Sequence, residues 1–128
     1  MAARILLTTF DCRDAVAISD FWATALGYEV NDLGSNPPEM IELHDPVGHG
    51  HPLFFVNVPE PKTVKNRVHL DLVTDLSMAD EVERLVAAGA KAIAVHQHPT
   101  EFNDPYEWTV LQDPEGNEFC VGRPLPPN

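Results

Sequence analysis

The stretch Trp108-Thr-Val-Leu-Gln-Asp-Pro-Glu-Gly-Asn-Glu-Phe-Cys-Val121 decides the fold, because it joins two strand-like runs through a tight turn. Its centre, Asp113-Pro-Glu-Gly, has the residue types that favour a turn. Half a chain earlier, Asp45-Pro-Val-Gly has the same form and also lies just before a strand-like run. This recurrence indicates that the chain contains an internal repeat.

Each half of the chain also carries one segment with apolar residues at helical spacing. The first begins at Asp14, an N-cap residue, and stops at Gly27. The second begins at Ser77 and stops at Gly89. The predicted helices are 14–26 and 77–88.

Strand-like runs bounded by turn residues accompany each helix in the same order, so each half reads βαβββ. The predicted strands are 4–10, 28–32, 39–44, 53–58, 67–73, 90–95, 106–112 and 117–122. The sequence therefore predicts an α+β fold with module one at about 4–58, a linker at about 59–66 and module two at about 67–122. Module two has the longer loop, at about 96–105.

Composition limits the possible partners of the protein. A chain of 128 residues fits a single domain over 1–128. Its 8 basic and 20 acidic residues give a net charge of −12, which argues against binding to nucleic acid or to an anionic membrane. Two cysteines, Cys12 and Cys120, are too few for a disulfide scaffold, so we expect a cytoplasmic protein.

Strand alternation singles out His69. In the predicted strand 67–73, Arg67, His69 and Asp71 share one face, and the residues between them are apolar. The apolar face suits packing on the helix at 77–88, so we expect the polar face to line water or a site. Imidazole and carboxylate groups are ligands for divalent metals.

Three segments resemble the glyoxalase-like domains of the vicinal oxygen chelate superfamily, which includes glyoxalase, bleomycin-resistance proteins and extradiol dioxygenases. They are Phe21-Trp-Ala-Thr-Ala-Leu-Gly27, Val58-Pro-Glu-Pro-Lys-Thr-Val-Lys-Asn-Arg-Val-His-Leu-Asp-Leu72 and Trp108–Val121. The resemblance spans nearly the whole chain. It implies two βαβββ modules whose strands form a cupped mixed sheet, with helices outside and a small organic ligand in the cup.

In family members that use a metal, ligands come from the first and last strands of each module, and His69 and Glu118 match these positions in module two. In module one, the helix-stop spacing sets Leu7 opposite His69, and alignment of Val56 with Val121 sets Leu53 opposite Glu118. Neither leucine can bind a metal, so the four-ligand set is incomplete. We expect both to give the cavity an apolar wall.

A third metal ligand is needed if the site works with a metal, and His51, or His49 beside it, is the candidate. The metal would be Zn, Ni, Fe or Mn. In the alternative without a metal, His69 and Glu118 hydrogen-bond each other or water.

Further candidates line the predicted cup. Phe55 and Trp108 would hold a flat organic ligand, although Trp108 suits core packing equally well. Arg67, with Lys62 and Lys65, would attract a substrate carboxylate, or these basic residues would pair with nearby Asp and Glu residues.

Two functions follow from this reading. The first is a small-molecule-binding protein of the drug-resistance or sequestering type. The alternative is a metal-dependent lyase, isomerase or dioxygenase that uses His69 and Glu118 as metal ligands. A structural or interaction protein is a third possibility. By analogy with the family we expect a homodimer.

Overall fold

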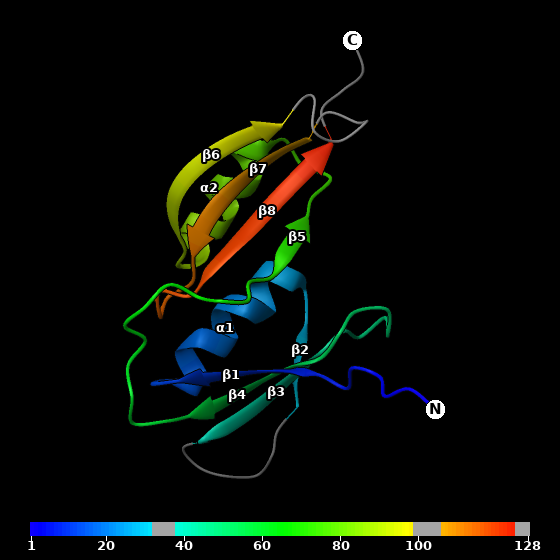
Figure 1. The fold of residues 1–128 in the computed structure, drawn as a ribbon, viewed down its shortest axis with the longest axis vertical. Helices are drawn as coiled ribbons and strands as arrows, with labels where there is room; N and C mark the ends of the chain where they lie inside the picture. The colour runs from blue at the N-terminus through cyan, green and yellow to red at the C-terminus, as the bar shows by residue number, and fades with distance from the viewer. Residues whose placement is uncertain (32–37, 99–105, 125–128) are drawn as a thin grey trace. The chain divides into compact units, whose positions relative to one another are not determined.

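The computed structural model describes residues 1–31, 38–98 and 106–124. The chain divides into two compact units, Met1–Thr63 and Val64–Asn128, which we call module one and module two. Each contains one helix and a four-stranded mixed sheet in the order βαβββ (Figure 1). The α+β fold class and the two-module repeat predicted from the sequence are confirmed.

Module one contains β1 (Thr8–Cys12), α1 (Ala15–Leu26), β2 (Glu29–Asn31), β3 (Met40–His44) and β4 (Leu53–Asn57). The strand order is β1-β4-β3-β2, in which β1 runs parallel to β4 and the other pairs are antiparallel. A parallel first and last strand requires a crossover, which α1 begins. Residue 32 of the predicted strand 28–32 lies outside the described residues.

Helix α1 forms where the sequence predicts it. The Asp14 carboxylate accepts a hydrogen bond from the Ala17 N–H, and Gly27 ends the helix with a φ of 69°. The buried face of α1 includes Trp22, which lies 5.6 Å from Phe10 between ring centroids. Phe10 in turn lies 5.1 Å from Phe55 on β4, so an aromatic cluster joins helix and sheet.

Module two contains β5 (Asp71–Val73), α2 (Met78–Ala88), β6 (Lys91–His98), β7 (Tyr106–Gln112) and β8 (Glu118–Pro124). The strand order β5-β8-β7-β6 repeats that of module one, again with the first and last strands parallel. Strand β6 extends through residues 96–98 of the predicted longer loop. The rest of that loop, 99–105, lies outside the described residues.

Helix α2 also begins and ends as predicted. The Ser77 hydroxyl accepts from the Asp80 N–H, and the helix stops at Gly89. Its packing is less complete than that of α1, because Leu85 is its only fully buried apolar side chain within the described residues. Buried Glu81 lies beside it, where the carboxylate pairs with Arg84 and accepts a hydrogen bond from the Thr74 hydroxyl.

The first strand of each module is shorter than predicted. Strand β1 begins at Thr8 rather than at residue 4, because its ladder with β4 ends where the Thr8 N–H donates to the Pro52 carbonyl. Proline cannot donate a hydrogen bond to continue the ladder. Strand β5 begins at Asp71 rather than at residue 67, and the expected packing of Val68 on the helix is wrong because this side chain is 82 % exposed.

Candidate functional site

Three potential metal ligands converge on one face of the module two sheet. His69 Nε2 lies 3.3 Å from Asp71 Oδ1, and Cys120 Sγ joins them so that the three ligand atoms lie within 4.8 Å of one another. Asp71 pairs with Cys120 in the β5–β8 ladder, and His69 precedes Asp71 by two residues. Register and alternation therefore set the three side chains on the same face.

This face is the one opposite α2, and we call it the open face of module two. The helix-side positions of β7 and β8 are buried and include Leu111, Phe119 and Val121. The alternate positions, Trp108, Val110 and Cys120, point the other way. Figure 1 shows α2 behind the strands of the sheet, which leaves the other face uncovered by a helix of this module.

The chemistry of Cys120 depends on these neighbours. Burial is the main cause that raises the pKa of the Cys120 thiol from 9.0 to about 11, and the negative charge of Asp71 and a hydrogen bond to it add to the shift. The positive charge of Lys65 acts in the opposite direction. The thiol is therefore protonated at neutral pH, and a metal ion bound here would displace that proton.

An aromatic row crosses the same face. Trp108 stacks on His96 with 5.2 Å between ring centroids and an interplanar angle of 20°. Tyr106 also stacks on Trp108, with 6.2 Å between ring centroids. His96 is the register partner of Trp108 on β6, so the stacking is a cross-strand contact. The row presents flat apolar surface with polar atoms at its edges.

Tyr106 connects the aromatic row to the ligand cluster. Its hydroxyl lies over the backbone of Gly122, so close that a Cβ at this position would clash with it. Burial raises the pKa of Tyr106, and the nearby charges of Asp71 and Cys120 raise it further. The two groups therefore form one continuous surface, which we call the open-face site: His69, Asp71, Tyr106, Trp108, His96 and Cys120.

Glu118 and Arg67, both predicted as site residues, are on β8 and in the segment before β5. Glu118 shares its strand face with Cys120, and its Oε1 accepts a hydrogen bond of 2.8 Å from the Asn66 N–H. The Asn66 side chain donates to the Glu118 carbonyl. These contacts of Asn66 connect the segment before β5 to β8, where a longer β5 was predicted. Arg67 is exposed in the segment before β5. The hydrogen bond or shared metal predicted for His69 and Glu118 stays a prediction.

The structure places Leu53 and Phe55 in the core of module one. Both are buried and share the helix side of β4, where Phe55 contacts Phe10. The predicted alignment of Val56 with Val121 is wrong by one residue, because Val121 is on the helix side of its sheet and Val56 is not. Since a shift of one residue reverses the face of a strand, Leu53 cannot be the counterpart of Glu118.

Leu7 and His51, the other predicted residues of module one, lie near the start of β1. Leu7 is half-buried just before the strand. His51 Nε2 lies 3.0 Å from the Thr8 hydroxyl oxygen, within hydrogen-bonding distance. The third-ligand role predicted for His51 stays a prediction, whereas the geometry of module two brings Asp71 and Cys120 to His69.

The sequence alone set Asp71 on the same strand face as His69, but we did not name Asp71 or Cys120 as a metal ligand from it. A signal was present, since Asp71 follows His69 by two residues and Cys120 follows Glu118 by two. Side chains two residues apart on a strand share a face. What alternation could not give was the register that pairs Asp71 with Cys120.

The donor set of the cluster determines what it could bind. A nitrogen, a carboxylate oxygen and a sulfur suit borderline and soft divalent ions such as Zn²⁺. His69 and Asp71 are exposed, so an ion and a ligand oxygen would have access. The described residues thus include a group that could hold a divalent metal beside a flat aromatic surface.

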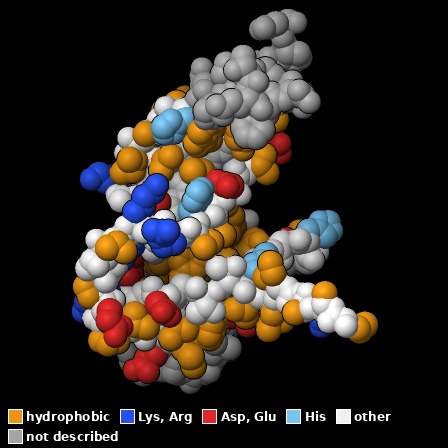
Figure 2. Space-filling model, viewed as in Figure 1, with side chains coloured by type: hydrophobic (Ala, Val, Ile, Leu, Met, Phe, Trp, Pro, Cys, Tyr) orange, Lys and Arg blue, Asp and Glu red, His pale blue; other side chains and the backbone are white. Residues whose placement is uncertain are grey.

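Charged and apolar side chains are mixed on the face that Figure 2 shows. Figure 2 shows hydrophobic side chains interspersed with acidic and basic ones on the face in view. Large apolar residues that are exposed include Val64, Val68 and Val73, around the start of β5.

No helix among the described residues has both the length and the apolar character needed to cross a membrane.

The two βαβββ modules are the arrangement that the resemblance to glyoxalase-like domains implies. Comparison with protein families agrees, because the model of the glyoxalase-like domain matches residues 8–122. The chain belongs to this family, within the vicinal oxygen chelate superfamily. No curated protein matches the sequence.

Solved structures share the fold at low sequence identity. A glyoxalase/bleomycin resistance protein/dioxygenase family enzyme from Burkholderia phytofirmans PsJN is 23% identical, with a TM-score of 0.73 over 96% of this chain and 100% of that chain. The fosfomycin resistance protein FosX from Mesorhizobium loti is 12% identical, with a TM-score of 0.70 over 96% and 93%.

A mutant of the FosX protein from Listeria monocytogenes is also 12% identical, with a TM-score of 0.72 over 94% of this chain and 90% of that chain. It was solved with Mn(II) and a dihydroxypropylphosphonic acid. At these identities the similarity establishes the fold of the present chain.

Proposed function

We propose that the protein binds a small, flat organic molecule on the open-face site, as a binder of the drug-resistance or sequestering type. The observation that carries the proposal is the stacked row of His96, Trp108 and Tyr106 beside the group of His69, Asp71 and Cys120. The row offers stacking surface, and the polar group offers an anchor for one edge of the ligand. We include Glu118 and Arg67 in the proposed site, because Glu118 shares its strand face with Cys120 and Arg67 precedes His69 by two residues.

The charge of the protein favours a neutral or cationic ligand. The net charge of −12 raises the local concentration of cations, and the carboxylates of Asp71 and Glu118 offset the positive charges of Arg67 and Lys65. A planar cation also gains from the faces of Trp108 and Tyr106 through cation–π attraction. We therefore choose proflavine, a planar aromatic cation, as the probe, and naphthalene-2-sulfonate as its anionic counterpart.

The test is a fluorescence anisotropy titration of proflavine with the protein. We expect saturable binding of one proflavine per chain and weaker binding of naphthalene-2-sulfonate. Trp108→Leu should weaken proflavine binding at least tenfold, because it removes the centre of the aromatic row. Val16→Ala, which shortens an exposed side chain on α1, is the control and should bind as the wild type does.

Unchanged affinity in Trp108→Leu, with circular dichroism showing a folded protein, would contradict the proposal. So would a loss of equal size in Val16→Ala, since that outcome would show that proflavine adsorbs to apolar surface in general.

We further propose that His69, Asp71 and Cys120 hold one divalent ion. Their three donor types support Zn²⁺ over Mn²⁺, because sulfur prefers the softer ion. A bound ion would polarise an oxygen of the ligand, which is the chemistry that the alternative function, a metal-dependent lyase, isomerase or dioxygenase, requires. In that case the residues of this chain would orient the ligand on the aromatic row.

Isothermal titration with ZnCl₂ tests the metal proposal on protein first treated with a chelator. We expect one site per chain, release of a proton on binding, and loss of the site in His69→Ala. Asp20→Ala, which removes an exposed carboxylate of α1, should retain it. Equal Zn²⁺ binding by wild type and His69→Ala would refute the metal site and leave the organic-ligand proposal to its own titration.

We also propose that the two modules make one domain, as the chain length predicts, and that the protein is cytoplasmic, as its two cysteines predict. The family resemblance implies a homodimer. Light scattering at micromolar concentration tests the dimer, and a mass equal to one chain would contradict it.

A further inference from the structure

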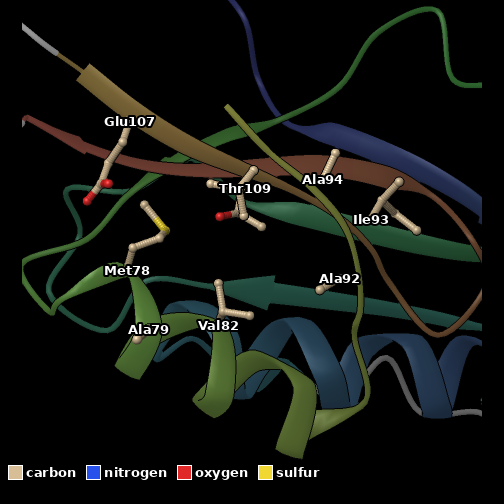
Figure 3. A pocket seen from close by; sticks show the side chains of 9 residues that line it. Met78, Ala79, Val82, Ala92, Ile93, Ala94, Glu107 and Thr109 are labelled. Atoms are coloured by element: carbon tan, nitrogen blue, oxygen red, sulfur yellow. The ribbon is translucent and has the colours of Figure 1, made fainter. Parts of the chain in front are cut away.

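A groove of about 500 Å³ lies on the helix side of module two, away from the open-face site. Figure 3 shows that it opens between the first turns of α2 and the strands β6 and β7. Apolar side chains form most of it, and the lining includes Met78, Val82, Ile93 and Val95. The groove is large enough for a small molecule, since ligand sites commonly enclose about 300–1,000 Å³.

Two local features of the sequence explain why the helix does not fill this space. The register between β6 and β7 shifts between Ala92 and Ala94, so Ile93 is an additional residue in the edge strand at this point. The apolar face of α2 is anchored by Leu85, whereas Met78 and Val82 nearer the helix start are only half-buried. Protein interiors are otherwise close-packed, so an apolar gap of this size is a place for an additional occupant.

A buried polar group is part of the lining. Thr109 is 1 % exposed, and its hydroxyl oxygen has no hydrogen-bond partner among the described residues. In Figure 3 the Thr109 side chain points into the groove on the side of Met78 and Val82. Buried polar atoms almost always have a partner, so this hydroxyl is suited to a hydrogen bond from outside the chain.

The charges around the groove indicate the character of the occupant. Glu107 lines one end, and its carboxylate lies 3.9 Å from the guanidinium of Arg123, so its charge is already compensated. The unsatisfied group is therefore the neutral hydroxyl of Thr109. Met78, whose flexible side chain lies next to it, can move to admit a ligand.

We propose that this groove is a second binding site, which takes a small neutral amphiphile such as an aliphatic alcohol. The polar head hydrogen-bonds the Thr109 hydroxyl, and the alkyl chain lies against Met78, Val82 and Ile93. The site is separate from the open-face site, because Thr109 and Trp108 are consecutive residues that point to opposite faces of β7. If this second site does not bind an alcohol, the proposed function of the open-face site is unaffected.

Hexan-1-ol is the probe, and the methyl groups of the three methionines report on its binding by ¹H–¹³C NMR. We expect the Met78 signal to shift saturably, while Met1 and exposed Met40, both in module one, stay in place as internal controls. Thr109→Val keeps the shape and removes the hydroxyl. It should weaken hexan-1-ol binding about fivefold and raise the melting temperature by a few degrees.

Val82→Trp, which fills the groove, should abolish the shift of Met78. The proposal would be overturned by an unmoved Met78 signal, by shifts of all three methionines without saturation, or by wild-type affinity in Thr109→Val. If Val82→Trp does not fold, the near-isosteric Thr109→Val decides between these outcomes on its own.

Discussion

Cys120 shows how neighbours set the reactivity of a single residue. In the protein without metal, burial and Asp71 raise the pKa of its thiol to about 11, so at pH 8 the thiolate fraction is about a hundredfold below that of a thiol at 9.0. We predict slow alkylation by iodoacetamide at pH 8 and faster alkylation in Asp71→Asn, which removes the neighbouring charge. Mass spectrometry of the Cys120 peptide separates its rate from that of Cys12.

The same shift has a consequence for stability. The pKa of the Cys120 thiol is higher in the folded protein than in the unfolded chain. Its contribution to the free energy of unfolding is therefore complete below about pH 9 and declines as the pH rises from 9 to 11.

The control for the alkylation experiment is Asp75→Asn, which removes an exposed carboxylate outside the cluster and should react with iodoacetamide at the wild-type rate. An Asp71→Asn variant that reacts no faster would show that Asp71 does not govern the thiol.

Gly122 tests the link between the aromatic row and the ligand cluster. A methyl group at this position meets the Tyr106 hydroxyl, so in Gly122→Ala the ring must move away and its stacking on Trp108 is lost. We predict a severalfold loss of proflavine affinity, together with an overpacking cost of about 1–3 kcal/mol in the free energy of unfolding.

Gly50→Ala is a matched control in module one, where a Cβ meets the hydroxyl of Tyr28 in the same way. It should reduce stability without weakening proflavine binding. Equal effects of the two variants on affinity would contradict the role assigned to Tyr106, since both would then act through general destabilisation.

At the scale of elements, the two Asp-Pro-x-Gly turns are built alike but differ in burial. Asp113 is 3 % exposed and accepts hydrogen bonds from the N–H groups of Glu115 and Asn117 and from the Asn117 side chain. Asp45 accepts from three backbone N–H groups on a more exposed loop, and those of Val47 and Gly50 hold its pKa below the usual value.

Replacing each aspartate by alanine measures this difference. Asp113→Ala should destabilise module two by about 2–3 kcal/mol, because buried N–H groups lose their acceptor. Asp45→Ala should have a smaller effect on stability. The pKa of Asp45 is lowered in the folded protein, so this effect is complete above the unfolded pKa of an aspartate and is lost as the pH falls through the lower folded pKa. Chemical denaturation at pH 7 and at low pH compares them, and a larger loss in Asp45→Ala would contradict the account.

The elements also show what could be predicted from the sequence. Helix ends were predictable because they depend on local residues, such as Asp14 with Ala17 and Ser77 with Asp80. Strand ends were not, because β1 stops where its partner has Pro52 and β5 gives way to the contacts of Asn66. These limits depend on pairing between residues far apart in the chain.

The candidate site was predictable to the same extent. Alternation identified His69 and the resemblance identified Glu118, and Trp108 was correctly assigned to a strand. The missing information was the register between strands, which brings Cys120 to Asp71 and sets Leu53 on the helix side of β4. An alignment error of one residue exchanged the two faces of a strand.

At the scale of the whole molecule, the repeat gives two similar sheets with different chemistry. Helix caps and turns recur in both modules, but within the described residues the group of three potential metal ligands occurs in module two alone. Module two also contains the groove on its helix side. The two modules thus share a fold, and the side chains of module two give it the candidate sites. A fold shared by both modules therefore does not by itself determine function.

The central claim is that the open face of module two binds a flat organic ligand. A ¹H–¹⁵N NMR titration with proflavine tests it most directly, because the amide signals report on the strands of both modules in one experiment. The account predicts saturable shifts centred on β5, β7 and β8, with the largest at Asp71, Trp108 and Cys120, and none on α1. Shifts centred on Met78 and Val82, or no saturable shift in module two, would contradict it.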